Sequence, residues 1–325
     1  MRRLFYSTDR VSMRFVIIGP GALGCLLAAA LGADHQHEVW LLDHDQQRAN
    51  LLDRQGLFLT SADHRELHCQ VRATADAGAI NGCDCILLCV KSHQIRAAID
   101  AGAPLFRTAP LTITFQNGIT HLETIAATLP DDSWAAGVTA QGATLLGPGR
   151  IRHGGAGPTR VGFMQPVPIA SQKRLQLVTV ALSKAGIDTE VTDNIHHHIW
   201  RKLLINVGIN ALTAIHGCAN GELLSSATGL SRLRRAVAEG AAVAAGLGVH
   251  LDEDPVALTM AVCRATSTNI SSMRQDVLKK RRTEIDAING AVVKAGQHLH
   301  IAVPENEALS REIKLLEKTY LHNYP

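Results

Sequence analysis

Three polar side chains recur at every fourth position of an otherwise apolar stretch. They are Lys202, Asn206 and Asn210, and the surrounding residues are mostly Leu, Ile, Val and Ala. At 3.6 residues per helical turn, this spacing places all three on one stripe of a helix, which we expect to be at least partly buried. Buried lysine and asparagine are costly unless they meet a ligand or one another, and burial lowers the pKa of a lysine toward the range useful for proton transfer. The stripe therefore predicts a ligand site with a proton-transferring lysine, and the alternative is the solvated edge of an amphipathic helix.

Three glycines with the spacing G-x-G-x-x-G follow the first strand-like run of the chain. The run 15–18 leads into Gly19, Gly21 and Gly24, and a helical pattern follows at once. The first glycine permits a tight turn, the second lets the backbone approach a pyrophosphate, and the third lets helix and strand pack closely. Because the N-terminus of a helix presents free N–H groups, the segment predicts a site for the phosphates of a dinucleotide. The alternative is an ordinary strand–helix turn with three accidental glycines.

An acidic residue stands where the second strand is expected to end. Asp43 lies 19 residues beyond Gly24, where an acid would bind the ribose 2′-hydroxyl of NAD and repel a 2′-phosphate. However, His44 follows it and Arg48 lies about one helical turn further, and either could meet that phosphate. Asp43 could also simply cap the following helix. The residues themselves leave NAD against NADP open.

Two further polar clusters, 268–276 and 282–290, fit helix caps and exposed helix faces when they are taken alone. His196, His197 and His198 stand just before the Lys202 stripe. Adjacent histidines point in different directions around a helix, and no acid or cysteine completes a ligand set at i+4 spacing. We therefore expect no metal site.

Short β-rich runs alternate with helical patterns from Arg14 to about Val191, which is typical of βαβ units around a parallel sheet. The expected strands are 15–18, 38–42, 85–90, 111–115 and 134–139, and the expected helices between them are 22–32, 46–55, 93–101 and 121–129. Residues 56–73 predict a small antiparallel excursion. The Gly- and Pro-rich segment 140–165 predicts turns and short strands near the sheet edge.

The pattern becomes helical throughout after Asp193. The expected helices are 196–215, 230–247, 255–263, 271–280, 284–297 and 305–322. Thr283 with Asp286 three residues later indicates a capping box that starts the helix at 284. We predict an α/β fold with an N-terminal Rossmann-type parallel-sheet domain at 1–190 and an all-helical C-terminal domain at 191–325. Residues 1–12 are expected to be a loose extension.

The composition excludes several classes of protein. The 325 residues are 46% hydrophobic, and 32 Lys and Arg against 29 Asp and Glu leave a net charge of +3. That balance and the scarcity of aromatic residues argue against a nucleic-acid-binding surface. No apolar stretch approaches the roughly 18–20 residues of a membrane span, and no apolar run follows the first arginines to form a secretory signal. The odd number of cysteines, seven, indicates thiols in a reducing compartment, and we expect a cytoplasmic protein.

Several of these segments occur together in one known family. The matching stretches are GPGALG at 19–24, CVKSHQ at 89–94, QNG at 116–118, GATLLGPG at 142–149, WRKLLINVGINALTAI at 200–215, NGELL at 220–224, NISSMRQD at 269–276, TEIDAING at 283–290 and IAVPEN at 301–306. Motifs in matching order and at matching spacing are more specific than any one of them. From Phe15 to Glu307 the chain resembles the ketopantoate reductase (2-dehydropantoate 2-reductase) family.

The resemblance implies an NADP-dependent oxidoreductase that transfers a hydride from NADPH to 2-dehydropantoate, giving (R)-pantoate for pantothenate and coenzyme A. It implies that Lys202 is the catalytic lysine that supplies a proton to the ketone oxygen, and that the second catalytic residue, Glu284, helps to set that lysine. The implied substrate-binding residues are Asn117, Asn206, Asn210, Asn220, Asn269 and Ser272. The glycine turn and the residues at the expected end of the second strand are also predicted to bind the cofactor. The full set of expected cofactor-binding residues is Gly19, Pro20, Gly21, Ala22, Leu23, Gly24, Asp43, His44, Arg48, Lys91, Asn117, Ala143 and Glu284.

The chain departs from the family pattern at one position. Many members carry an arginine directly after the second strand to hold the 2′-phosphate, whereas this chain has His44 preceded by Asp43. We expect NADP(H), with NAD(H) as the alternative because of Asp43. Two rival functions are a reductase of another branched 2-oxo acid and a non-catalytic NAD(P)-binding sensor.

The expected partners follow from this interpretation. They are a small 2-oxo acid, with no nucleic acid and no membrane, and the active site is expected in the cleft between the two domains. A homodimer is one option, since helical domains of this sort often offer dimer surfaces, although the sequence shows no exposed heptad repeat.

Overall fold

The computed structural model of the chain describes residues 12–33, 35–61 and 63–321. These residues divide into two compact units. The first contains the residues up to Val90, Arg96–Phe115 and Leu129–Asp193, and the second contains Lys91–Ile95, Gln116–Thr128 and the residues from Asn194 onward. The loose extension expected at 1–12 falls, apart from Ser12, outside the described residues. Within the described ranges, no helix is long and apolar enough to cross a membrane.

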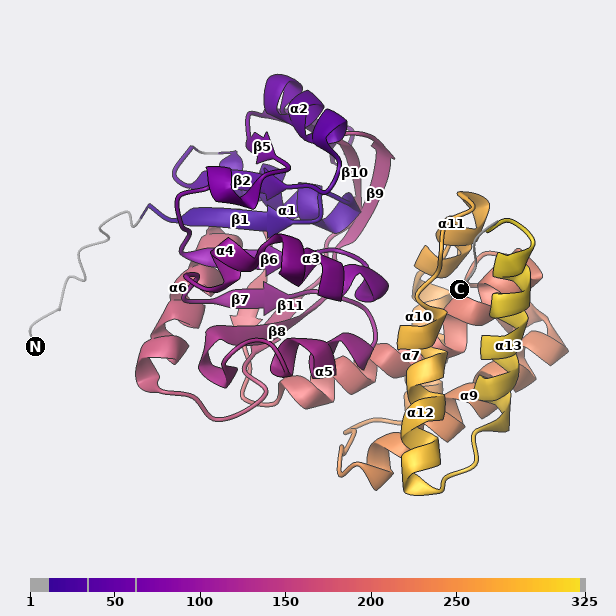
Figure 1. Cartoon of the computed structure of the whole chain (residues 1–325). Helices are drawn as coiled ribbons and strands as arrows, with labels where there is room; N and C mark the ends of the chain where they lie inside the picture. Colours follow the sequence, from indigo (N-terminus) through magenta and orange to yellow (C-terminus); the bar gives the residue numbers. More distant parts are fainter. Residues whose placement is uncertain (1–11, 34, 62, 322–325) are drawn as a thin grey trace, which may run out of the picture. The chain divides into compact units, whose positions relative to one another are not determined.

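An eight-stranded sheet forms the centre of the first unit (Figure 1). Its order is β12-β11-β8-β7-β6-β1-β2-β5. The strands are β1 (Arg14–Ile18), β2 (Glu38–Leu42), β5 (Arg72–Thr74), β6 (Cys85–Leu88), β7 (Thr112–Thr114), β8 (Trp134–Thr139), β11 (Thr159–Gly162) and β12 (Thr189–Val191). Every neighbouring pair is parallel except β8 and β11. The run β5-β2-β1-β6-β7-β8 has the 3-2-1-4-5-6 order of doubly wound dinucleotide-binding sheets, which confirms the predicted fold class.

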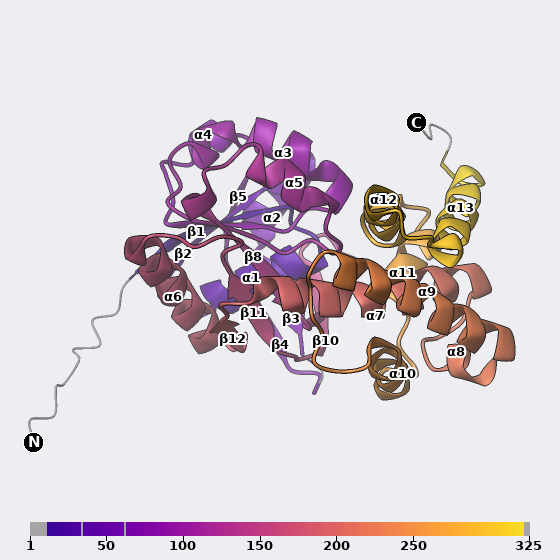
Figure 2. The ribbon, with the colours of Figure 1, turned by 90° about the horizontal axis from the view of Figure 1, so that it is seen from below.

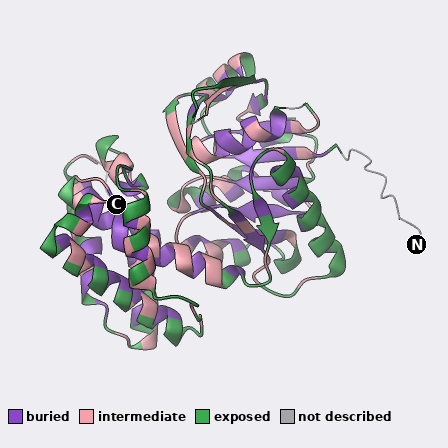
Figure 3. Cartoon of the chain, turned by 180° about the vertical axis from the view of Figure 1, so that it is seen from behind, coloured by how far each residue is buried: buried purple, intermediate pink, exposed green. Residues whose placement is uncertain are grey.

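Apolar strands covered on both faces make this sheet the core of the first unit. The last four residues of β1 are buried, and Figure 3 shows the central strands in the buried colour. Helices α1 (Ala22–Gly32) and α6 (Ile169–Lys184) contact each other on one face of the sheet, whereas α3 (Ile95–Ala101) and α4 (Ala103–Phe106) cover the other (Figure 2). Strands buried on both faces read as continuous apolar runs, which is why the sequence pattern located them.

A second sheet of four strands belongs to the same unit. Its order is β4 (Glu66–Cys69), β3 (Leu57–Thr60), β10 (Arg150–Gly155) and β9 (Gly142–Gly147). The antiparallel pair β3–β4 confirms the excursion predicted at 56–73. The prediction for 140–165 is wrong for β9 and β10, because these strands leave the main sheet and β10 pairs in parallel with β3.

Every element of the second unit among the described residues is helical. They are η2 (Ser92–Gln94), α5 (Thr120–Ala126), α7 (Ile195–His216), α8 (Glu222–Ser225), α9 (Ala227–Gly246), α10 (Pro255–Ala265), α11 (Ser272–Leu278), η4 (Ile285–Ala287), α12 (Asn289–Leu299) and α13 (Pro304–Lys318). Helix α7 packs against α9, α10, α11 and α13. It begins after Asn194, whose side chain accepts the N–H of His197, and it ends at Gly217 in the left-handed conformation.

Two helix predictions need correction. The helix predicted from Glu284 begins only at Asn289, because Thr283 accepts the N–H of Ile285 at 3.2 Å and the chain first makes a short 3-10 turn. Helix α6 has no counterpart among the predicted helices. Its buried residues, such as Leu175 and Val178, are interleaved with exposed apolar ones, such as Leu177 and Val180, which weakens the amphipathic pattern.

Candidate active site

Each glycine of the turn after β1 meets a different structural requirement. Gly19 has φ +94°, and a Cβ there would lie 2.7 Å from the backbone nitrogen of Val90. A Cβ on Gly24 would lie 2.3 Å from the carbonyl oxygen of Gly19, so α1 packs directly on the turn. A Cβ on Gly21 would meet nothing within 4 Å. The backbone at Gly21 therefore borders open space at the N-terminus of α1, and this geometry fits the approach of a pyrophosphate.

Asp43, His44 and Arg48 lie together at the end of β2. Helix α2 (Gln46–Gln55) begins after Asp45, which caps it by accepting the N–H groups of Gln47 and Arg48. The carboxylate of Asp43 accepts hydrogen bonds from Nε and Nη2 of Arg48, the latter at 2.5 Å, and from the N–H of Asp45 at 3.1 Å. The side chain of Asp43 has no exposed surface, whereas 33% of Arg48 and 76% of His44 are exposed. The acid is thus covered, whereas His44 is largely exposed and Arg48 is partly exposed.

Two carboxylates and a lysine meet within the second unit. Nζ of Lys91 lies 2.7 Å from Oδ2 of Asp276 and 3.3 Å from Oε2 of Glu284. Glu284 also accepts the N–H of Ser92 and the side-chain amide of Asn117, each at 3.1 Å. Burial raises the pKa of Glu284, but the charge of Lys91 and these hydrogen bonds outweigh it, so the net pKa lies below its ordinary value. Glu284 is therefore an ionised carboxylate at neutral pH.

Lys202 has the electrostatic surroundings of a proton donor. It lies on α7 and is partly buried, as is Asn206, while Asn210 is buried. Burial lowers the pKa of Lys202 to about 8, and the charge of Glu284 opposes that shift. An ammonium with such a pKa is charged at neutral pH yet gives up its proton readily. The helical stripe is therefore at least partly buried, as its apolar surroundings predict.

Amide and hydroxyl groups gather between α7, α11 and the segment after α7. The side-chain amide of Asn210 lies 3.5 Å from the hydroxyl of Ser272. Asn220 donates to Thr266 at 2.9 Å, and its backbone N–H donates to the carbonyl of Asn269 at 3.0 Å. Among the described residues, Oδ1 of Asn220 is buried without a partner. Neutral donors and acceptors of this kind can recognise a carboxylate or hydroxyl without adding charge.

The sequence-predicted residues divide between the two units. The first unit holds the turn Gly19–Gly24 and Asp43, His44, Arg48 and Ala143, and the second holds Lys91, Asn117, Lys202, Asn206, Asn210, Asn220, Asn269, Ser272 and Glu284. Within the second unit, direct contacts join Lys91, Asn117 and Glu284, and a separate contact joins Asn210 to Ser272. Ala143 lies in β9 opposite His153, in the four-stranded sheet.

Sequence reasoning missed two ionisable residues of this cluster. Asp276 stands four residues after Ser272 on the same face of α11, and this helical spacing was the available signal. His121 in α5 is 4% exposed, and burial lowers its pKa to about 4 against the opposing charge of Glu284. Nothing in the spacing around His121 marks it, because its burial beside Glu284 depends on residues far away in the chain.

A glycine beside Asn117 fixes the approach of two segments. Gly118 has φ +82°, and a Cβ there would lie 1.9 Å from the carbonyl oxygen of Ala287. We predict that Gly118→Ala lowers the free energy of unfolding by about 2–4 kcal/mol, because both the left-handed backbone and the contact disfavour a side chain. Urea denaturation measures the change.

A matched control separates the two causes. Gly248 lies in the same unit with φ +75°, but a Cβ there would meet nothing within 4 Å. Gly248→Ala should lower the free energy of unfolding by only about 1 kcal/mol. Equal losses in the two variants would show that the contact with Ala287 contributes nothing.

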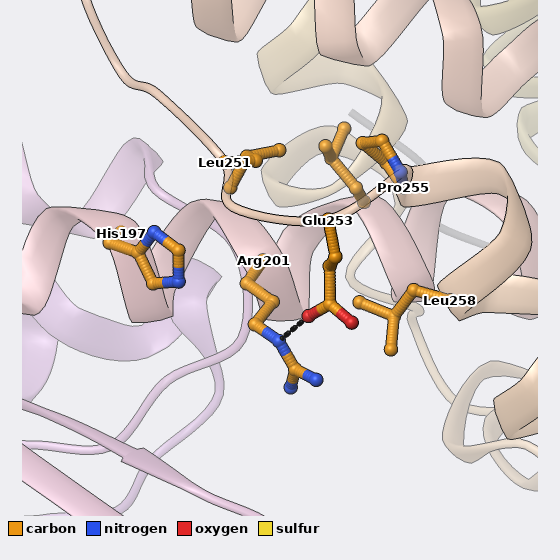
Figure 4. A pocket seen from close by; sticks show the side chains of 7 residues that line it. His197, Arg201, Leu251, Glu253, Pro255 and Leu258 are labelled. Atoms are coloured by element: carbon orange, nitrogen blue, oxygen red, sulfur yellow. Dashed lines mark hydrogen bonds and ion pairs between the residues drawn. The ribbon is translucent and has the colours of Figure 1, made fainter.

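The histidine triplet has a structural role at His197. Its Nδ1 lies 3.1 Å from the carbonyl oxygen of His250, and Nε2 lies 3.8 Å from the carboxylate of Asp252. Arg201 pairs with Glu253 at 2.5 Å beside it (Figure 4). His197, Arg201 and Glu253 border a cavity of about 10 Å³, which is room for a single water molecule. Within 12–33, 35–61 and 63–321, no group of three or more His, Cys, Asp or Glu is placed to hold a metal ion.

Models of one protein family match both halves of the chain. The model described as "Ketopantoate reductase PanE/ApbA" matches residues 15–166, and the model described as "Ketopantoate reductase PanE/ApbA C terminal" matches residues 194–317. Together the matches cover most of the chain.

Individual proteins are similar over nearly the whole length. The 2-dehydropantoate 2-reductase of Halobacterium salinarum is 34% identical over 306 residues, which are 94% of this chain and 99% of that protein. The crystal structure of a PanE/ApbA family ketopantoate reductase from Ralstonia eutropha has a TM-score of 0.86 and 31% identity, covering 95% of this chain and all of that one. The ternary structure of D-mandelate dehydrogenase with NADH and anilino(oxo)acetate also has a TM-score of 0.86, with 27% identity over 95% of this chain and 99% of that chain.

Proposed function

We propose that this chain, which belongs to the ketopantoate reductase family, reduces 2-dehydropantoate to (R)-pantoate in the pathway to pantothenate. The observation that carries the proposal is the partly buried Lys202, whose proton is made available by burial and whose charge Glu284 supports. A 2-oxo acid that accepts a hydride needs one proton at its ketone oxygen, and this lysine can provide it.

A reduced nicotinamide dinucleotide, with NADPH as our proposal, would be held by the glycine turn and by the residues at the end of β2. The open space at Gly21 and the partly exposed guanidinium of Arg48 after β2 support this assignment. By family resemblance, Lys91, Asn117, Ala143 and Glu284 complete the cofactor-binding set. When bound, the cofactor supplies the hydride.

The residues of the second unit stabilise the charge that develops on the substrate. Lys202 donates a hydrogen bond to the ketone oxygen, stabilises the negative charge there and passes on its proton. Glu284 keeps that lysine charged, while Lys91 and Asn117 hold the Glu284 carboxylate in place. Asp276 shares the charge of Lys91.

Five neutral side chains are the candidates for recognising the rest of the acid: Asn206, Asn210, Asn220, Asn269 and Ser272. The pair Asn210 and Ser272 offers an amide donor and a hydroxyl within 3.5 Å of each other, which suits a carboxylate. The orphaned Oδ1 of Asn220 is an acceptor for a substrate hydroxyl. The sensor alternative has no use for a proton donor such as Lys202.

A second candidate function is the reduction of a 2-oxo acid with a different side chain. The likeness to D-mandelate dehydrogenase favours it, since that protein has the same fold over nearly its whole length. Its name identifies an aromatic 2-hydroxy acid, so phenylglyoxylate is the corresponding oxidised substrate to test here.

A comparison of acceptors distinguishes the two candidates. We expect kcat/KM for 2-dehydropantoate to exceed that for 3,3-dimethyl-2-oxobutanoate, which lacks only the hydroxyl, by about 10- to 100-fold, because the analogue leaves a buried acceptor of the site unsatisfied. Phenylglyoxylate should be poorer still. Oxidation of the reduced nicotinamide measures each rate, and a preference for phenylglyoxylate would favour the second candidate.

A further inference from the structure

The acidic residue at the end of β2 is not presented to a ligand. All of the Asp43 side chain is covered, and its Oδ1 accepts from both Nη2 of Arg48 and the N–H of Asp45. Its Oδ2 accepts from Nε of Arg48. A ribose hydroxyl could reach this carboxylate only after Arg48 had moved. The usual role of an acid at this place, accepting the 2′-hydroxyl of NAD, is therefore blocked in this structure.

The arginine that covers Asp43 is itself partly exposed. Arginine carries five N–H donors, and two of them are used in the fork to Asp43. Among the described residues, the other three have no protein acceptor, and a third of the side chain is exposed. A guanidinium fixed along one edge keeps its other edge for an anion, and this planar donor set matches phosphate geometry.

This pair lies close to the phosphate-binding turn. The backbone N–H of Gly19 donates to the carbonyl of Leu42, the residue before Asp43, at 3.1 Å. Cys25, in the first turn of α1, has its pKa raised mainly by burial, with a further effect from the charge of Asp43 and an opposing one from Arg48. Both charged groups are therefore within electrostatic range of the helix that follows the turn.

We propose that Asp43 is a positioning residue that holds Arg48, and that Arg48 selects a dinucleotide with a 2′-phosphate on its adenosine ribose. Asp43, whose place in the sequence favours NAD, then supports recognition of NADP by holding Arg48. His44, whose side chain is largely exposed, lies beside the pair but is not held by it in the same bidentate way. The proposal rests on the proposed function only in taking a nicotinamide dinucleotide as the ligand.

The two interpretations of Asp43 predict opposite effects of the same substitution. If Asp43 repels a 2′-phosphate, then Asp43→Asn should strengthen binding of the phosphorylated ligand. If Asp43 holds Arg48, then Asp43→Asn should weaken it, because the guanidinium loses its fixed orientation.

Calorimetric titration with adenosine 2′,5′-bisphosphate and with 5′-AMP isolates the contribution of the 2′-phosphate without any turnover. We expect the full chain to bind the bisphosphate more tightly than 5′-AMP. Arg48→Ala should weaken bisphosphate binding by about 10- to 100-fold, because it removes charge-assisted hydrogen bonds to the 2′-phosphate. The same substitution should leave 5′-AMP binding within about twofold. Arg54→Ala is the matched control, since Arg54 is an exposed arginine on the same helix.

A double-variant cycle tests whether Asp43 acts through Arg48. Asp43→Asn should weaken bisphosphate binding several-fold in the wild-type background and have no effect on it once Arg48 is alanine. The double variant buries no uncompensated charge, so it keeps the test available if a single variant does not fold. Tighter binding in Asp43→Asn, or unchanged binding in Arg48→Ala, would overturn the proposal.

Turnover assays separate failure of this inference from failure of the proposed function. Selective binding of the bisphosphate without reduction of 2-dehydropantoate would refute the function and leave the role of Arg48 standing. Reduction of 2-dehydropantoate with equal use of NADH and NADPH, and no effect of Arg48→Ala on bisphosphate binding, would refute the role of Arg48 and leave the proposed function standing.

Discussion

Lys202→Ala should lower kcat for 2-dehydropantoate by about 10³-fold, because it removes both the proton donor that we propose and its positive charge. Binding of NADPH should change little, since Lys202 is not among the residues that we assign to the cofactor. Calorimetric titration with NADPH and steady-state rates with saturating substrate measure the two effects separately.

A lysine of the same unit provides the control. Lys294 is half exposed and pairs with Glu123 on the surface, so Lys294→Ala should leave kcat within about twofold. If Lys202→Ala kept a tenth or more of wild-type kcat, the proton would have to come from another group. A joint loss of turnover and of NADPH binding would indicate a folding defect rather than a chemical one, and circular dichroism would then show it.

Glu284→Gln should lower kcat by about 10- to 100-fold near pH 8 and change the shape of the pH profile. In the wild-type chain the rate should fall as the pH rises through about 8, because Lys202, the proton donor that we propose, then loses its proton. The charge of Glu284 raises the pKa of that lysine. Without this charge the pKa of Lys202 falls, so the descending limb should move to lower pH.

The direction of that shift distinguishes an electrostatic role from a purely structural one. Glutamine keeps the size of the side chain, so a variant that only loosens the site should lose activity equally at every pH. A descending limb that stays in place, or moves to higher pH, would contradict the role assigned to Glu284. Glu123→Gln, which changes an exposed carboxylate of the same unit, should leave the profile unchanged.

The elements whose local pattern agrees with their surroundings are the ones that the sequence predicts well. Strand β2 and helices α1 and α2 have the predicted bounds, because apolar runs, caps and glycines all indicate the same structure there. The pairing of β10 with β3 joins segments about 90 residues apart, and no local pattern specifies such a partner. The capping box predicted at Thr283 is wrong for a related reason. The backbone N–H of Thr283 donates to the side chain of Glu317 at 2.6 Å, and Glu317 is distant in the sequence.

The candidate site is predictable in its residue types and less so in its arrangement. The periodicity of Lys202, Asn206 and Asn210 identifies the polar stripe without any structure. Asp276 and Lys91 are 185 residues apart in the chain, and only the fold brings them together. Asp43 is the clearest case, because its place in the sequence favours one cofactor whereas its burial under Arg48 favours the other. The cytoplasmic location and the homodimer stay predictions.

The most direct test of the central claim is the identity of the product. The chain is incubated with 2-dehydropantoate and NADPH, and pantoate is quantified by chiral chromatography against the NADPH consumed. We predict one (R)-pantoate for each NADPH oxidised, with kcat/KM above about 10⁴ M⁻¹s⁻¹, as is usual for an enzyme acting on its own substrate. NADPH that binds but is not oxidised, or is oxidised without formation of (R)-pantoate, would contradict the assignment of this chain as a 2-dehydropantoate reductase.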